Sequence, residues 1–141
     1  MTLSTAPAPE GAPEPATVTF SDFGLHPDVL KAVTAAGYTK PTPIQAKAIP
    51  VVMAGYDVMA AAQTGTGKTA GFALPIINAL MPSASHSASP ARHPVRALII
   101  APTRELADQI HDNVKTYIQF TPLRSAAVFG GVDMQPQTNA L

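Results

Sequence analysis

The chain is constrained most by a glycine-rich stretch at residues 61–69, which reads Ala-Ala-Gln-Thr-Gly-Thr-Gly-Lys-Thr. Gly65 and Gly67 allow the backbone to turn so that successive N–H groups point inward at an anion. Lys68 supplies a positive charge for outer phosphates, and the Thr69 hydroxyl can occupy one coordination position on Mg²⁺. The stretch therefore predicts a phosphate cradle, whose residues are Thr64, Gly65, Thr66, Gly67, Lys68 and Thr69.

The neighbours of this cradle indicate a strand, a loop and a helix in that order. Residues 57–61 form a short apolar run, which predicts a buried strand, and a helix is predicted to begin at Thr69. The positive end of the helix dipole would then face the phosphates. The general phosphate-loop pattern has glycine where this chain has Ala62, which indicates a variant loop that tolerates a methyl group. The alternative is a glycine-rich turn without a ligand, but such a turn does not require Lys68.

The composition narrows the class of protein. With 141 residues, the chain forms at most one domain and is long enough for a hydrophobic core. Its formal net charge is zero, so any nucleic-acid contact must come from local geometry rather than bulk charge. Cysteine is absent and the four histidines lack metal-ligand spacing, so no zinc site is expected. No stretch of about 18 apolar residues is present, and we expect a cytoplasmic protein without membrane contact.

The residues before the first helix are predicted to form a tail. Residues 1–19 are rich in proline and alanine and cannot bury enough apolar surface to offset the entropy of ordering. Order is expected to begin at Phe20. A short amphipathic helix is then predicted between Pro27, which suits a first helical position, and Gly37, which suits a helix end.

A second helix is predicted directly after the first. Thr42 supplies an N-cap hydroxyl, Pro43 takes the first helical position, and Gln45 takes the third. This spacing predicts a capping box, in which two side chains reciprocally satisfy free backbone N–H groups. The helix is predicted to end at Pro50.

The rest of the chain predicts alternating helices and strands. A helix from Thr69 is expected to continue past Pro75 to Met81, followed by an exposed polar loop at 82–94. Strands are predicted at 95–101 and 125–129. The helix between them carries an apolar stripe with a spacing of four: Leu106, Ile110, Val114 and Ile118. This order predicts an α/β fold with a parallel sheet, helices on both faces and right-handed crossovers.

Four motifs together resemble the DEAD-box RNA helicase family. Residues 37–45 (Gly-Tyr-Thr-Lys-Pro-Thr-Pro-Ile-Gln) are similar to its adenine-recognising Q motif, and Phe20 stands at the family's isolated upstream aromatic position. Residues 62–69 are similar to motif I, residues 102–107 to motif Ia, and Gly130-Gly131 to the double-glycine motif. The resemblance covers residues 20 to about 135, and the motif sequences are most similar to those of the bacterial RhlE-like subgroup. It implies a RecA-like P-loop NTPase domain.

The resemblance implies a role for each matching residue. Gln45 would hold the adenine edge, and Tyr38 and Phe20 would lie against or support the base. Lys40 would stand on the nucleotide side, while the phosphate cradle holds ATP, with Lys68 and Thr69 taking part in catalysis and Thr69 binding Mg²⁺. The residues that would face the RNA backbone are Pro102, Thr103, Arg104, Gly130 and Gly131.

Local sequence leaves a structural alternative for most of these roles. Gln45 is also explained as a capping-box residue alone, and Arg104 as part of the charged first turn of a helix. Tyr38 and Phe20 are also explained as core aromatics. Gly130-Gly131 is also explained as the end of a strand.

Several parts of the family pattern are absent from the chain. It contains no Asp-Glu-Ala-Asp motif, no Ser-Ala-Thr motif and no second domain. We therefore expect residues 20–141 to be the first part of the first helicase domain, cut after its third strand. Such a chain is expected to expose apolar strand edges and to hydrolyse ATP poorly by itself.

Two other functions remain open from the sequence. One is a non-catalytic fragment that binds nucleotide or RNA. The other is a small P-loop nucleotide kinase, which would need an arginine-rich lid that the scattered basic residues do not provide.

Overall fold

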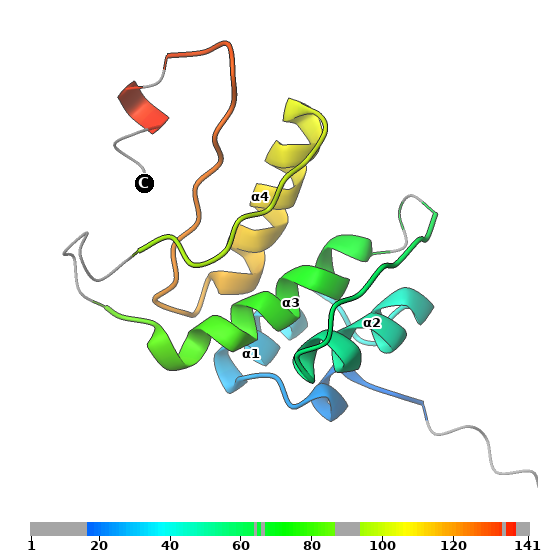
Figure 1. The fold of residues 1–141 in the computed structure, drawn as a ribbon. Coiled ribbons are helices and arrows are strands. Elements are labelled where there is room, and N and C mark those ends of the chain that lie inside the picture. Colours follow the sequence, from blue (N-terminus) through cyan, green and yellow to red (C-terminus); the bar gives the residue numbers. More distant parts are fainter. Residues whose placement is uncertain (1–16, 64, 66, 87–93, 134, 138–141) are drawn as a thin grey trace, which may run out of the picture.

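The structure, a computed structural model, describes residues 17–63, 65, 67–86, 94–133 and 135–137. Its main elements are helical (Figure 1). In chain order they are the 3-10 helix η1 (Phe20–Phe23), α1 (Pro27–Ala35), α2 (Pro43–Met53), α3 (Lys68–Leu80), the 3-10 helix η2 (Met81–Ser83) and α4 (Arg104–Ile118).

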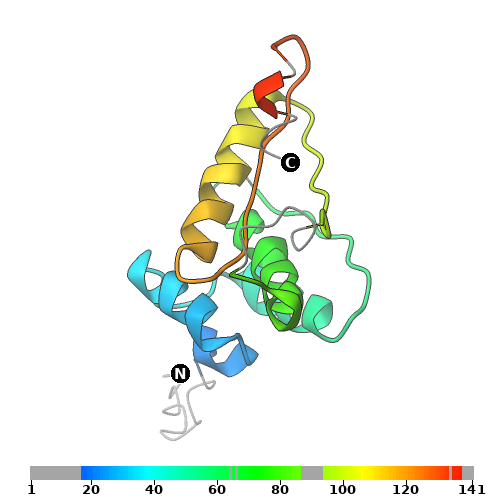
Figure 2. The same ribbon diagram turned by 90° about the vertical axis from the view of Figure 1, so that its left-hand side faces the viewer.

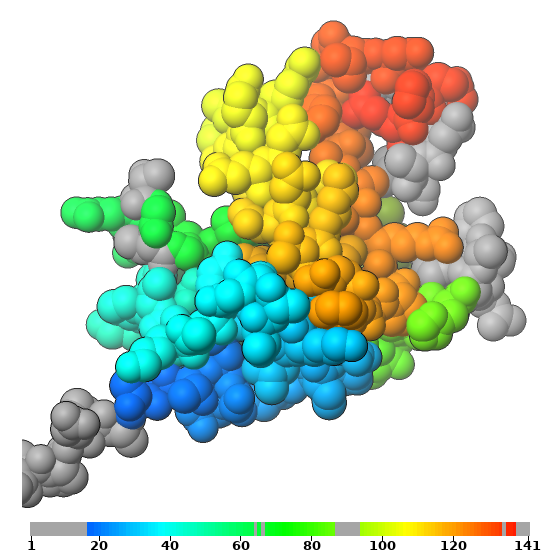
Figure 3. Space-filling view, turned by 180° about the vertical axis from the view of Figure 1, so that it is seen from behind, coloured from blue at the N-terminus to red at the C-terminus, as the bar shows by residue number. Residues whose placement is uncertain are grey.

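Helix α3 is central and packs against α1, α2 and α4 (Figure 1). Its small residues allow α2 to approach closely: a Cβ built on Gly71 would lie 3.9 Å from the Cβ of Ala48. The view from behind shows the region of α1 directly against the C-terminal half of α4 (Figure 3), where the Lys31 ammonium lies 4.3 Å from the centre of the Phe120 ring. The core between these elements is formed by Phe20, Leu25, Val29, Val33, Ile49, Ala70, Ala73, Leu74, Ile77 and Tyr117.

The predicted start and end of α1 are confirmed. Pro27 is the first helical residue, and Gly37 follows the helix with a φ of 82°, a left-handed conformation that favours glycine. The N–H of Tyr38 then donates to the Val33 carbonyl at 3.1 Å. This bond fixes the backbone of Tyr38 at the end of α1.

The predicted capping box of α2 is confirmed, but its predicted end is wrong. Thr42 and Gln45 cap the helix reciprocally. The helix then passes through Pro50 and ends at Met53. A proline inside a helix lacks the N–H donor and its ring crowds the carbonyl of the preceding turn, but the Pro50 carbonyl still accepts a hydrogen bond from the N–H of Ala54 at 3.0 Å. Because Ile49 is fully buried beside it, packing holds this turn in place.

The predicted parallel sheet is not confirmed, because none of the described residues belongs to a β-strand. Residues 57–61, 95–101 and 125–129 run as non-helical segments beside the helices (Figure 2). Leu98 and Ile100 are 80% and 83% exposed. A strand needs the N–H and C=O groups of a neighbouring strand, whereas a helix forms its hydrogen bonds within itself. Among the described residues these segments lack such neighbours.

Side chains take the place of a strand partner at one point. The Gln137 amide accepts a hydrogen bond from the Phe129 N–H at 2.5 Å and donates one to the Phe129 carbonyl at 3.1 Å. A side-chain amide therefore secures the end of the third predicted strand.

The segments at residues 95–99 and 122–128 border a cavity of about 420 Å³ together with α3 and α4.

The prediction for α4 is confirmed in extent and, for Val114 and Ile118, also in its buried face, since both pack partly buried against the core. Leu106, the first residue of the predicted stripe, is 38% exposed. The fully buried residue of α4 is instead Tyr117, which is 1% exposed. Leu106, at the N-terminal end of the stripe, therefore lacks a covering layer among the described residues.

The remaining predicted regions are a helix, a loop and a tail, of which the structure describes the helix in full. Helix α3 runs from Lys68 through Pro75 to Leu80, as predicted to within one residue. Residues 87–93 of the predicted loop and residues 1–16 of the predicted tail lie outside the described residues. Within the described part, no helix is long and apolar enough to cross a membrane.

Candidate functional site

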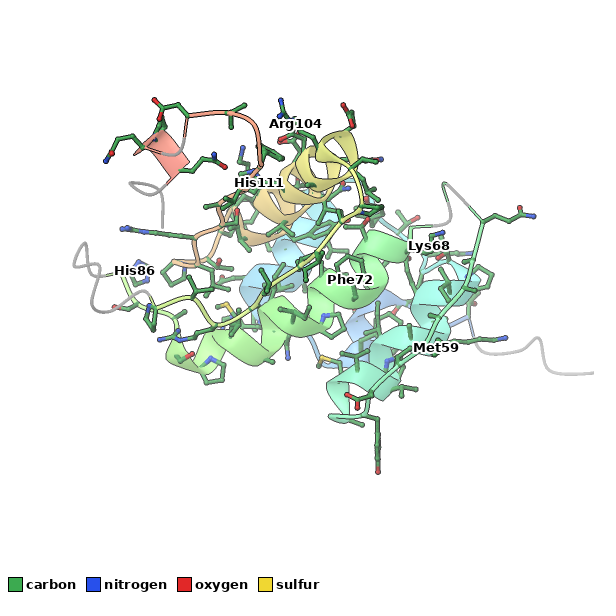
Figure 4. All side chains as sticks on the ribbon, turned by 45° about the horizontal axis from the view of Figure 1, so that its top comes forward. Met59, Lys68, Phe72, His86, Arg104 and His111 are labelled. Atoms are coloured by element: carbon green, nitrogen blue, oxygen red, sulfur yellow. The ribbon has the colours of Figure 1, made fainter. Side chains whose placement is uncertain are left out.

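The predicted phosphate cradle lies where its loop enters α3. Gly65 and Gly67 have φ angles of 81° and 78°, which glycine adopts readily. Lys68 is the first residue of α3, and its ammonium donates a hydrogen bond to the Ala62 carbonyl within the same loop (Lys68 is labelled in Figure 4). The helix N-terminus and the lysine are therefore at the same point, as predicted. Thr64 and Thr66 lie outside the described residues.

Gln45 joins this loop to the start of α2. Its side chain is 1% exposed. The side-chain oxygen Oε1 accepts from the Thr42 N–H at 2.9 Å, and Nε2 donates to the Gly67 carbonyl at 3.1 Å. The capping alternative for Gln45 is thus realised, and the same amide also holds the phosphate loop. Among the described residues, these bonds leave one lone pair of Oε1 and one N–H of Nε2.

Gly67 is required by the close approach of Gln45. A Cβ on Gly67 would lie 2.2 Å from Nε2 of Gln45 and 3.2 Å from its Cδ. No real Cβ tolerates the shorter distance, so any other residue at this position would displace the Gln45 amide. Gly65 has a similar φ, but a Cβ there would meet no described atom within 4 Å.

The predicted aromatic residues form a connected cluster. The rings of Phe20 and Tyr38 lie 6.1 Å apart, as do those of Tyr38 and Tyr117, in tilted arrangements. Phe20 is buried and Tyr38 is half-buried. The cluster lies between η1, the end of α1 and α4, so the core-aromatic alternative holds for Phe20. Lys40, placed on the nucleotide side by the sequence, is exposed.

Tyr117 was not predicted by the sequence reasoning. Its hydroxyl lies 3.3 Å from that of Tyr38. Burial raises the pKa of the Tyr117 hydroxyl, and the hydrogen bond with Tyr38 raises it further, so Tyr117 stays neutral. The signal was present: Tyr117 stands three residues after Val114, a spacing that shares a helix face as well as the spacing of four.

The residues predicted to face RNA lie together at the N-terminus of α4. The Arg104 guanidinium donates to the Gly130 carbonyl at 2.8 Å and lies 5.6 Å from the centre of the Phe129 ring. A Cβ on Gly131 would lie 3.8 Å from the same guanidinium. Thr103 caps α4, its hydroxyl oxygen accepting from the Leu106 N–H at 3.2 Å. A shallow pocket of about 290 Å³ is bordered by Pro102, Thr103, Arg104, Phe129 and Gly130.

The two groups of predicted residues occupy different parts of the molecule. Figure 4 shows Lys68 at the start of α3 and Arg104 at the N-terminal end of α4, away from Lys68. Among the described residues, no group of three or more His, Asp or Glu side chains could hold a metal ion. The Thr69 hydroxyl, in the first turn of α3, is an oxygen group of the kind that Mg²⁺ binds.

Comparison with known proteins gives a consistent result. The model of the DEAD/DEAH box helicase family matches residues 42–141. The DEAD-box ATP-dependent RNA helicase RhpA of Helicobacter pylori is 50% identical over 118 residues, which are 84% of this chain and 22% of that protein. The ATP-dependent RNA helicase RhlB of Hamiltonella defensa is 46% identical over 122 residues, which are 86% of this chain and 29% of RhlB.

Solved structures match the fold as well. A crystal structure of a DEAD box protein from the hyperthermophile Methanococcus jannaschii has a TM-score of 0.72 and 34% identity, covering 87% of this chain and 32% of that one. The crystal structure of the RNA helicase Prp28 from Chaetomium thermophilum, bound to ADP, has a TM-score of 0.70 and 33% identity, covering 92% of this chain and 31% of that one. The chain therefore spans about a fifth to a third of the proteins that it matches.

Proposed function

Because the chain belongs to the DEAD/DEAH box helicase family, we propose that it is the ATP-binding N-terminal portion of an ATP-dependent RNA helicase. In the complete protein, ATP binding and hydrolysis would drive the unwinding of RNA duplexes. The observation that carries this proposal is the loop at the start of α3, where two left-handed glycines precede Lys68 and the Gly67 carbonyl is held by the buried amide of Gln45.

The phosphates of ATP would bind at the N-terminus of α3. There the free N–H groups of the first turn and the helix dipole favour an anion. In the structure, the Lys68 ammonium donates a hydrogen bond to the Ala62 carbonyl. ATP would therefore exchange that neutral acceptor for charged phosphate oxygens, which form stronger bonds with an ammonium. Mg²⁺, bound through the Thr69 hydroxyl, would neutralise part of the phosphate charge.

The base would be recognised by Gln45 and Tyr38. Beyond its bonds to described residues, the Gln45 amide has a lone pair and an N–H that match the N6–H donor and N7 acceptor of adenine. Because Gln45 is 1% exposed, the phosphate loop would have to shift for the base to reach them. Guanine presents two acceptors on the same edge, and an amide that offers one donor and one acceptor cannot pair with both. Tyr38 is half-buried, so part of its ring remains available to a base, while Phe20 supports it from the core. Exposed Lys40 would border this side of the nucleotide.

The RNA backbone would meet the cluster of Arg104, Gly130 and Gly131. One N–H of the Arg104 guanidinium is used by the Gly130 carbonyl, which orients the planar group. Its remaining donors suit phosphate oxygens. Thr103 and Pro102 are exposed next to it and would contact sugar and phosphate, without reading sequence.

The proposal extends to the architecture of the complete protein. Residues 20–141 would be part of a first RecA-like domain preceded by a tail at 1–19, and the segments 57–61, 95–101 and 125–129 would pair as parallel strands when further strands are present. Assignment to the RhlE-like subgroup, a cytoplasmic location and RNA as partner belong to the same proposal. The chain alone would bind ATP but hydrolyse it poorly.

Calorimetric titration with ATP and GTP tests the proposal. The wild-type chain, first checked for folding by far-UV circular dichroism, is expected to prefer ATP. Gln45→Ala should lower the preference for ATP over GTP, and Lys68→Ala should weaken the binding of both nucleotides to the same extent. Gln109→Ala is the matched control, because Gln109 is an exposed glutamine on α4.

The outcomes separate the possible roles of Gln45. A Gln45→Ala chain that loses stability but keeps its preference for ATP would restrict Gln45 to capping and loop support. A folded wild-type chain that binds no nucleotide would refute the ATP-binding proposal. Robust RNA-stimulated hydrolysis by the wild-type chain would refute the statement that it is inactive alone.

A further inference from the structure

The Tyr38–Tyr117 hydroxyl pair connects two distant parts of the chain. Tyr38 stands at the C-terminal end of α1, where its N–H is bonded to the Val33 carbonyl. Tyr117 stands in the last turn of α4 and is 1% exposed. Their hydroxyl oxygens lie 3.3 Å apart, although 79 positions separate the residues in sequence. The pair therefore bridges α1 and α4 at a point of direct packing.

The two tyrosines differ in freedom of movement. Tyr117 is enclosed on all sides by the core, so its ring is fixed and its hydroxyl is a stationary hydrogen-bonding group. Tyr38 is half-buried and is held by tilted ring contacts with Phe20 and Tyr117. The hydroxyl oxygen lies on the rotation axis of the phenol ring, so its hydrogen bond fixes the direction in which the Tyr38 side chain points, while the tilted ring contacts limit rotation about that axis. The fixed partner thus sets the orientation of the partly exposed one.

We propose that Tyr117 is a positioning residue for nucleotide binding: its buried hydroxyl orients the ring of Tyr38 toward the adenine. This inference rests on the proposed function, in which the exposed part of the Tyr38 ring lies against the base. Pre-orientation lowers the entropy that binding must otherwise overcome to immobilise a side chain. The benefit falls on a ligand whose base contacts that ring, and so it belongs to the adenine rather than to the phosphates.

Removal of either hydroxyl tests the inference. Tyr117→Phe and Tyr38→Phe each keep the ring and delete one end of the same hydrogen bond. A typical net hydrogen-bond contribution corresponds to a change of about threefold to tenfold in affinity. We expect each variant to weaken ATP binding by about that factor and to leave GTP binding nearly unchanged, so that the preference for ATP over GTP falls.

The double variant gives the sharpest readout. If both hydroxyls act through one bond, Tyr38→Phe combined with Tyr117→Phe weakens ATP no more than either single change does. Tyr56→Phe is the matched control, since Tyr56 is 70% exposed and should leave both nucleotides unaffected. Calorimetry with ATP and GTP measures all four variants beside the wild type, and a thermal melt without nucleotide confirms that each is folded.

Each result supports or overturns the inference. Unchanged ATP affinity in Tyr117→Phe, while Gln45→Ala still weakens ATP, would refute the role of Tyr117 and leave the proposed function intact. Additive losses in the double variant would show that the two hydroxyls act separately and would also refute it. Should Tyr117→Phe not fold, Tyr38→Phe reports on the same bond. A wild-type chain without preference for ATP would overturn the proposed function and this inference together.

Discussion

Replacement of Gly67 by alanine should destabilise the chain even when no nucleotide is present. Two separate penalties act at this position. The φ of 78° is a left-handed conformation, which costs a residue with a Cβ about 1–2 kcal/mol. The new Cβ would also lie 2.2 Å from Nε2 of Gln45, a contact that cannot persist. The Gln45 amide must therefore move.

The second penalty follows from the burial of that amide. Gln45 is 1% exposed and cannot exchange its protein partners for water without opening the joint between α2 and α3. Moving Nε2 breaks its bond to the Gly67 carbonyl and leaves a buried donor unsatisfied, at a cost of about 1–3 kcal/mol. The two penalties together amount to about 2–5 kcal/mol. This is a large share of the total stability of about 5–15 kcal/mol expected for a domain.

Urea unfolding followed by far-UV circular dichroism measures these penalties. Gly65→Ala is the matched control, because its φ of 81° carries the same conformational cost while its Cβ would meet no described atom within 4 Å. The difference between the two variants isolates the displacement of Gln45, about 1–3 kcal/mol. In a Gln45→Ala background, the cost of Gly67→Ala should fall to that of Gly65→Ala.

Equal losses of stability in Gly67→Ala and Gly65→Ala would refute this reasoning. So would a cost of Gly67→Ala that stays the same after Gln45 is truncated. Either result would mean that the amide does not hold the loop against α2, and that Gly67 is explained by backbone conformation alone.

Two further predictions concern the ends of the described structure. The Thr19 N–H and hydroxyl donate to the Asp22 carboxylate and lower its pKa. A lowered pKa stabilises the fold above the pKa of the unfolded state, and this stabilisation is lost as the pH falls through the folded pKa. Asp22→Asn should therefore flatten the decline of the melting temperature below about pH 4. An unchanged decline would contradict this. Arg104→Ala should weaken the binding of single-stranded RNA and, if Arg104 meets one phosphate, reduce the slope of log K against log salt concentration by about 0.7. Arg124→Ala is the control, because Arg124 is also exposed. A slope in Arg104→Ala equal to that of the wild type would place the phosphate contact elsewhere.

The local parts of the structure could be predicted from the sequence. The capping box of Thr42 and Gln45, the helix stop at Gly37 and the start of a helix at the phosphate cradle each depend on residues within a few positions of one another. The end of α2 could not be predicted in this way, because it depends on the burial of Ile49 rather than on Pro50. Local rules set where a helix starts more firmly than where packing lets it end.

Relations across the chain were accessible only in part. The motif resemblance placed Arg104 and Gly130 in one site, and the structure brings them to 2.8 Å. No motif pointed to the contact of Tyr38 with Tyr117, because a hydrogen bond between two side chains leaves no spacing in the sequence. The second role of Gln45, as donor to the Gly67 carbonyl, was hidden as well, because its partner is a backbone atom 22 positions away in the sequence.

The three predicted strands show why an apolar pattern does not by itself specify a sheet. Residues 95–101 are nearly all apolar, which indicates a strand covered on both faces, but coverage and pairing must be supplied by other segments. The helices need no such supply, since their backbone groups are satisfied internally and one buried stripe suffices. In the described residues α3 and α4 therefore form completely, while Leu98 and Ile100 of the intervening segment stay 80% and 83% exposed. The pattern at 95–101 thus states a requirement for neighbouring strands, and the helices that carry Lys68, Gln45 and Arg104 meet their own requirements without them.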